Sequence, residues 1–124
     1  MGSTQYCFAD GEMDYGNKLK TYVSDNTTGV YANTNVSITT IRPGIDKILG
    51  FSVQEIDTGA SEIVAVLYDA VSGDTLNNSN LMGEAESIVD SFNGLWFPYP
   101  ITLTNGLSIR QGGYTRVIVS YTTY

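Results

Sequence analysis

The chain has 124 residues with 13 acidic and six basic side chains, which gives a formal net charge of −7 at pH 7. Its length is that of a single domain with a sizeable core, and its few basic residues argue against a surface for nucleic acid or an anionic membrane. Histidine is absent, so the commonest general base, the commonest zinc ligand and every Ser–His or Cys–His pair are excluded.

Residues 1–18 differ from the rest of the chain and are expected to form an extended N-terminal arm, with one domain over residues 19–124. Turn-forming residues such as Asp10, Gly11 and Gly16 interrupt this stretch, which has little periodicity. Disorder and a strap across the domain are the alternatives. Four apolar side chains give the arm anchors that a disordered tail would not need: Tyr6, Phe8, Met13 and Tyr15.

Cys7 is the single cysteine, so the chain is not a disulfide scaffold. Its thiol is either a small buried or idle group, or it pairs with a neighbouring subunit. No stretch is long and apolar enough to span a membrane, and the start lacks the basic and apolar segments of a signal peptide. We therefore expect no attachment to a membrane.

Short runs of β-branched and apolar residues follow from residue 19, and turn-forming residues separate them, which is typical of strands. The first three strands are predicted near residues 19–23, 30–41 and 45–56, with turns at 24–29 and 42–44. The alternation is clearest in the third run. It predicts one face with Ile45, Leu49, Phe51 and Val53, opposite a face with Asp46, Gly50, Ser52 and Gln54.

The run 62–71 is almost continuously apolar, which predicts a strand that is covered on both faces. A polar surface loop rich in asparagine is expected over residues 75–83. The run 85–92 suits either a short helix or an irregular strand, because its apolar spacing fits both. Among so many strand candidates we favour a strand.

The Asn-Gly pair at 105–106 invites a two-residue hairpin. Such a turn would place Ile101 and Leu103 on one face and Leu107 and Ile109 on the other, so that one apolar set would face away from the core. A longer loop, a bulge or a corner where the chain changes sheets fits better. This favours a two-sheet sandwich over a simple meander.

The last run, 114–124, consists largely of β-branched and aromatic residues and predicts a core strand. Val117, Val119 and Tyr121 point to one face, and Ile118 leaves the other face partly covered. About eight strand candidates are present, and runs with helical periodicity are absent. The sequence therefore predicts an all-β fold, an antiparallel two-sheet sandwich.

The densest apolar site consists of four aromatic residues: Phe92, Trp96, Phe97 and Tyr99. We interpret them first as core or edge packing, where Pro98 and Pro100 would protect an edge strand from unwanted pairing. A subunit interface and a platform for stacking sugars are the alternatives. Trp96, Phe97 and Tyr99 are therefore the candidate interface or ligand residues.

Seven carboxylates are candidates for a calcium site or a catalytic pair: Asp57, Glu62, Asp69, Asp74, Glu84, Glu86 and Asp90. The calcium loop with aspartates at alternate positions is absent. Glu84 and Glu86 would share one strand face, but any acidic β protein offers such pairs. We expect a solvated surface, and we assign no catalytic, cofactor-binding or metal-binding residue.

Three sequence elements follow one another in a recognisable order. An apolar strand ends in Val-Leu-Tyr-Asp at 66–69, the element Asn-Gly-Leu occupies 105–107, and a strand rich in Val and Tyr closes the chain at 117–121. This order resembles that of small jelly-roll proteins of tailed bacteriophage particles. The resemblance covers residues 45–124, and the aromatic block at 96–99 and the N-terminal arm have no counterpart in it.

The resemblance implies a jelly-roll-like sandwich that serves as a non-enzymatic structural protein of the virion. Its place would be the outside of a phage head, as a capsid decoration (cement) or head-fibre subunit, homotrimeric and bound to the major capsid protein. No cofactor, nucleic acid or membrane is expected as a partner. Tyr6, Phe8, Met13 and Tyr15 are then the candidate contacts with the shell or with a neighbouring subunit.

The main alternative is a carbohydrate-binding β-sandwich module of a tail fibre or a secreted protein. Exposed coplanar rings at Trp96, Tyr99 or the C-terminal tyrosines would favour it. A glycosidase-like enzyme is a third possibility, which needs a cleft with two carboxylates about 5 to 10 Å apart. We expect a protein that is not an enzyme.

Overall fold

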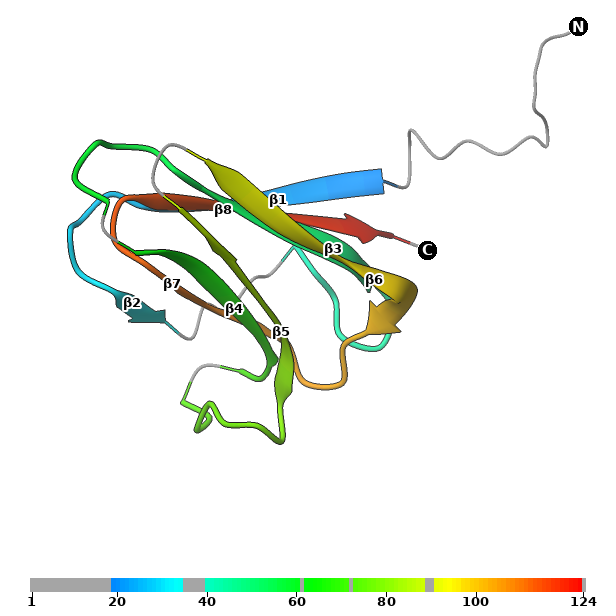
Figure 1. Cartoon of the computed structure of the whole chain (residues 1–124). Helices are drawn as coiled ribbons and strands as arrows, with labels where there is room; N and C mark the ends of the chain where they lie inside the picture. The colour runs from blue at the N-terminus through cyan, green and yellow to red at the C-terminus, as the bar shows by residue number, and fades with distance from the viewer. Residues whose placement is uncertain (1–18, 35–39, 61, 72, 89–90, 124) are drawn as a thin grey trace, which may run out of the picture.

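The computed structural model describes residues 19–34, 40–60, 62–71, 73–88 and 91–123. The predicted arm, with Cys7 and its four apolar anchors, lies outside this part of the chain. Eight strands and no helix occur among the described residues (Figure 1). The strands are β1 (Leu19–Asn26), β2 (Ala32–Thr34), β3 (Lys47–Glu55), β4 (Ile63–Asp69), β5 (Leu81–Ser87), β6 (Phe92–Thr102), β7 (Leu107–Gln111) and β8 (Thr115–Thr122).

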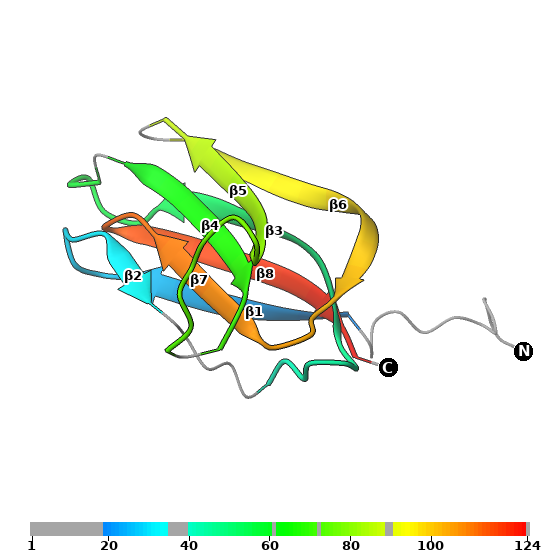
Figure 2. The same ribbon diagram turned by 90° about the horizontal axis from the view of Figure 1, so that it is seen from below.

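The strands form two antiparallel sheets of four strands each, which pack face to face (Figures 1 and 2). One sheet has the order β1-β8-β3-β6, and the other has the order β2-β7-β4-β5. β1 pairs with β8, β2 with β7, β3 with β6 and β4 with β5, so the second half of the chain matches the first half in reverse order. This nested pairing gives an eight-stranded jelly roll, and it confirms the expected all-β sandwich.

The core lies between the two sheets, because each strand turns alternate side chains inward. In β8, Val117, Val119 and Tyr121 are buried, as the alternation predicted. β4 is buried on both faces, because its inward side chains join the main core while Val64 and Tyr68 belong to a second apolar cluster. The prediction of a strand that is covered on both faces is therefore confirmed.

The predicted inward face around the start of β3 is wrong, because the strand contains a bulge. Its register against β8 shifts between Ile48 and Gly50, so that Leu49 is an extra residue. Since strand side chains alternate with a period of two, one inserted residue reverses the phase. Ile48 is therefore fully buried, whereas Ile45 is 47 % exposed, and Asp46, predicted on the polar face, is fully buried as well.

The chain changes sheets between β6 and β7, at residues 103–106. β6 belongs to one sheet and β7 to the other, so the two strands do not form a hairpin. Leu103 before the corner and Leu107 after it are both buried. The crossing thus lets both apolar sets reach the core. Of the three predicted alternatives to a hairpin, a longer loop, a bulge or a corner between sheets, the structure has the corner.

Two strands extend beyond their predicted limits. β1 continues to Asn26, into the turn predicted at 24–29, because all of its residues pair with β8. β5 begins at Leu81, within the loop predicted at 75–83, because it pairs with β4 from that point. In both places cross-strand pairing overrides a local sequence that is typical of turns.

The strand predicted over 30–41 is observed in part. Within the described residues of this run, the strand is β2, which comprises three residues, and residues 35–39 lie outside the described part. The ambiguous run 85–92 is not helical where it is described: it contains the end of β5 and the first residue of β6.

Candidate functional site

Exposed apolar side chains lie at two opposite edges of the sandwich. Among the described strands, β1 and β6 are outermost in one sheet, and β2 and β5 are outermost in the other. β5 and β6 lie together on one side of the sandwich (Figure 2). The aromatic edge on this side comprises Phe92, Trp96 and Tyr99. The β1 edge on the other side comprises Leu19 and Val23 of β1 with Val30 and Tyr31 after it.

The interpretation of the aromatic block as core or edge packing holds for only part of it. Trp96 is 64 % exposed, Tyr99 is 79 % exposed and Phe92 is 71 % exposed. Phe97 alone points the other way, packs against the core, and has its ring centroid 6.3 Å from that of Phe51. The four rings therefore divide into one that is structural and three that face solvent.

Tyr99 projects from the sandwich because β6 leaves the strand ladder at this point. Trp96 lies opposite Gly50 and Ile101 lies opposite Ile48, so residues 97–100 of β6 face a single residue of β3. Two of these four residues are prolines, which have no N–H to donate to the ladder. The prolines thus break the free edge of β6 where a second strand would otherwise pair with it.

Gly50 makes room for the indole of Trp96 against the outer face of the sheet. A Cβ at this position would lie 2.7 Å from Cε3 of the ring and 2.6 Å from the carbonyl oxygen of Leu95. A larger residue would therefore have to displace the indole or the strand. The glycine therefore lets the ring lie close against the sheet.

Small residues separate Trp96 from the next exposed ring on the same outer face. Ser52 of β3 lies opposite Gly94 of β6, and Gln54 lies opposite Phe92 in the following outward pair. An open hollow of about 400 Å³ adjoins Phe92 at the end of the sandwich. Its lining residues are Gln54, Glu55, Ile56, Asp57, Thr58, Ser91 and Phe92.

Asp69 has a structural role at the corner between β6 and β7. Its carboxylate accepts hydrogen bonds from the backbone N–H groups of Thr104 (2.9 Å), Asn105 (2.8 Å) and Gly106 (3.2 Å). At Gly106 a Cβ would lie 3.1 Å from the carbonyl oxygen of Ala70, so the corner sits tightly against the end of β4. Three neighbouring donors that converge on one carboxylate hold the corner in place.

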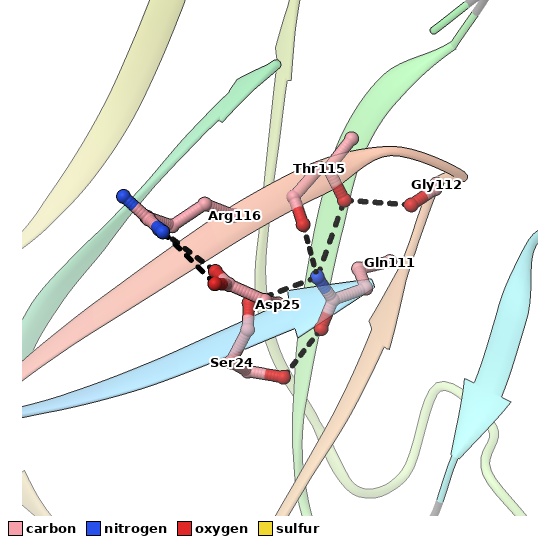
Figure 3. A network of polar contacts seen from close by, with 6 residues as sticks. All are labelled: Ser24, Asp25, Gln111, Gly112, Thr115 and Arg116. Carbon is pink, nitrogen blue, oxygen red and sulfur yellow. Dashed lines mark hydrogen bonds and ion pairs between the residues drawn. The ribbon is translucent and has the colours of Figure 1, made fainter. Parts of the chain in front are cut away.

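Gln111 joins the two sheets through its side-chain amide, which is buried (Figure 3). Its Nε2 donates to the carbonyl oxygens of Ser24 in β1 (3.0 Å) and Thr115 in β8 (3.1 Å), and its Oε1 accepts from the Ser24 hydroxyl (2.6 Å). The Thr115 hydroxyl in turn donates to the carbonyl oxygen of Gly112 (2.6 Å). These buried groups satisfy one another, so the network supports the fold.

Two ion pairs lower the pKa of a carboxyl group. The guanidinium of Arg116 donates to both carboxylate oxygens of Asp25 across β8 and β1, and it holds the pKa of Asp25 below its ordinary value (Figure 3). Burial by itself raises the pKa of Asp46, but hydrogen bonds from the backbone and guanidinium of Arg42, with its charge, outweigh burial. The pKa of Asp46 therefore also lies below its ordinary value of 3.8.

The structure places six of the seven candidate carboxylates. Within the described ranges, no group of three or more histidine, cysteine, aspartate or glutamate residues could hold a metal ion. Glu84 and Glu86 share the outward face of β5, as their spacing predicted, and both are exposed. Asp90 lies outside the described residues. The same ranges hold no helix that is long and apolar enough to cross a membrane.

Gly50 and Gly94, beside and between Trp96 and Phe92, were not predicted to belong to the candidate site. Gly50 and Gly94 lie inside strands, where a glycine often marks the close approach of another group. That signal was present in the sequence, but it did not identify the ring that approaches. The pairing of β3 with β6 was needed to place Gly50 under Trp96.

Comparison with known proteins identifies no relative. No protein-family model, no curated protein and no solved structure matches this chain.

Proposed function

We propose that this chain is a non-enzymatic structural subunit of a bacteriophage particle, which binds the major capsid protein outside the head and stabilises the shell. The observation that carries the proposal is a contact between two motifs of the resemblance. Residues 66–69 end β4, residues 105–107 begin β7, and the Asp69 carboxylate accepts hydrogen bonds from the backbone at 104–106. The two motifs of the resemblance, distant in sequence, therefore meet at one corner of the fold.

The jelly roll is the fold that the resemblance implies, but a fold alone does not fix a function. Attachment has to come from particular residues, and the β1 edge offers them. Leu19 and Val23 are each 49 % exposed, and Val30 is 72 % exposed. β1 is also the outermost strand of its sheet in the described part of the chain, so its free backbone edge can pair with another protein.

The predicted arm directly precedes β1 in the sequence, so its four apolar residues are linked through the chain to the β1 edge. Tyr6, Phe8, Met13 and Tyr15 are our candidate contacts with the shell or a neighbouring subunit. Apolar contact contributes roughly 25 cal/mol for each Å² removed from water, before the cost of association is subtracted. Trimeric subunits that bind at symmetric positions of the shell would gain further through multivalency.

Co-sedimentation with empty shells tests the proposal. The shells are made from the major capsid protein that we expect to be encoded beside this chain. The full chain should pellet with the shells and reach saturation, whereas a chain that lacks residues 1–17 should stay in the supernatant. Trp96→Ala, on the opposite edge, is the matched control and should pellet like the natural chain.

The outcomes separate the parts of the proposal. If the full chain does not pellet with the shells, it is not a decoration subunit. If the truncated chain pellets as well as the full chain, the arm is not the attachment segment. In that case Val23→Asp, which puts a charge on the β1 edge, should abolish the binding that remains.

A further inference from the structure

We propose that the outer face of β3 and β6 at the aromatic edge binds a neutral oligosaccharide, whose pyranose rings stack on Trp96 and Phe92. This inference goes beyond attachment to a shell and does not rest on it, because it concerns the opposite edge of the sandwich (Figure 2).

Trp96 has the placement of a preformed stacking platform. Its ring lies against the sheet at Gly50, where no side chain competes for the space, yet 64 % of the residue stays exposed. A ring that the sheet already holds loses little conformational entropy when a ligand stacks on it. A large aromatic residue that folding alone required would instead be expected in the core.

Phe92 supplies a second ring along the same strand. The two residues are four positions apart and face the same side, which corresponds to about 13 Å at roughly 3.3 Å per residue. One sugar ring cannot contact both, but a short chain of sugars can. Gly94 and Ser52 lie between them, so no large apolar side chain separates the two rings. Two separate platforms suit an oligosaccharide better than a protein partner, which needs a continuous apolar centre.

The hollow beside Phe92 supplies hydrogen-bonding groups. Gln54, Asp57, Thr58 and Ser91 line it with an amide, a carboxylate and two hydroxyls. Together these groups can both donate to sugar hydroxyls and accept from them. A largely apolar contact with a few polar groups at its margin is the usual composition of a small-molecule site.

The charge around the hollow favours a neutral ligand. Its lining includes the acidic residues Glu55 and Asp57 and no basic residue. Gln54 of β3 lies between Phe92 of β6 and Arg116 of β8. The guanidinium of Arg116 forms an ion pair with Asp25. Sulfated, phosphorylated or sialylated glycans would meet acidic groups here, so they should bind more weakly than neutral glycans.

Trp96 is the only tryptophan, so its fluorescence reports directly on this site. The full chain is titrated with cellohexaose, laminarihexaose and chitohexaose, and with a hyaluronan hexasaccharide as an acidic control. We expect a saturable change in emission with at least one neutral hexasaccharide and a weaker response to hyaluronan. Phe92→Ala should lower the affinity by about tenfold or more. Tyr31→Ala removes an exposed ring from the β1 edge and should leave the affinity unchanged.

Calorimetry with Trp96→Ala completes the test, because this variant cannot report by fluorescence, and its thermal unfolding shows whether it remains folded. Loss of binding by a folded Trp96→Ala variant supports the site. No response to any neutral hexasaccharide at millimolar concentration overturns it. The site is also overturned if Phe92→Ala binds sugar as tightly as the natural chain. An emission change that depends on protein concentration in the absence of sugar would overturn it as well, because it would indicate self-association. Failure here leaves attachment to the shell untouched, because co-sedimentation measures that separately.

Discussion

The Asp69 carboxylate binds the backbone at Gly106, 37 residues further along the chain. The same carboxylate accepts the N–H groups of Thr104 and Asn105, so the end of β4 fixes the corner where the chain passes from one sheet to the other. The aspartate of one motif and the glycine of the other therefore serve one structural purpose. The proposed relationship to phage head proteins depends on this pair.

Asp69→Ala should destabilise the fold by about 1–3 kcal/mol, because three backbone donors at the corner lose their acceptor. Chemical denaturation measures the loss. Asp57→Ala is the control: this carboxylate is exposed and accepts a long hydrogen bond from the adjacent Thr58 hydroxyl, so its removal should change stability by no more than about 0.5 kcal/mol. Equal stabilities of the two variants would contradict the role of Asp69.

Gly50→Ala should destabilise the fold by about 1–3 kcal/mol, because the new Cβ would overlap the Trp96 ring and the Leu95 carbonyl. It should also shift the Trp96 emission to longer wavelength as the indole moves into water. Ser52→Ala changes the next outward position of β3 and should alter neither quantity. An unchanged spectrum for Gly50→Ala would show that the glycine does not position the indole.

Gln111→Leu should destabilise the fold by about 1–3 kcal/mol or more, because the carbonyl oxygens of Ser24 and Thr115 would lose a buried donor. Thermal or urea unfolding measures this loss. Asn93→Leu removes a solvent-exposed amide that donates to the carbonyl oxygen of Glu86, and it should cost less. If Asn93→Leu were the more damaging variant, the link between the sheets at Gln111 would be unimportant.

Stability should decrease in acid partly through Asp46. Its pKa in the folded chain lies below the ordinary value of 3.8, so the unfolded chain binds the proton more readily. Its contribution is therefore complete above the unfolded pKa and is lost as the pH falls through the folded pKa. The difference in unfolding free energy between the natural chain and Asp46→Asn should be constant above about pH 5 and shrink below about pH 4.

Asp25→Asn is the control for this pH dependence. The pKa of Asp25 is also lowered, mainly by its hydrogen bonds to Arg116, so the sign of its effect is the same. Both partners of this pair are partly exposed, and such pairs contribute little because water screens them. The assignment would be contradicted if the difference in unfolding free energy from the natural chain varied more with pH for Asp25→Asn than for Asp46→Asn.

Period-two patterns were enough to predict much of the fold. They placed Val117 and Val119 in the core, marked β4 as buried on both faces, and argued against a two-residue hairpin between Leu103 and Leu107. They failed at Ile48, because a bulge depends on how a strand matches its neighbours and its own alternation does not reveal it.

Only part of the candidate site could be predicted from the sequence. The cluster of aromatic residues drew attention to Trp96 and Tyr99, but composition favours burial of such rings, and exposure follows from their place at the edge of a sheet. Phe97 is the clearest example, because it follows Trp96 in the sequence and yet faces the opposite side of the sheet. The sheet order settled which rings face solvent.

Electron cryo-microscopy of shells with and without this chain tests the central claim most directly. The difference map should show added density on the outer surface of the shell at symmetric positions, with the β1 edge toward the shell and Trp96 toward solvent. The account would be contradicted if particles incubated with excess chain showed no added density. Density inside the shell would contradict it equally.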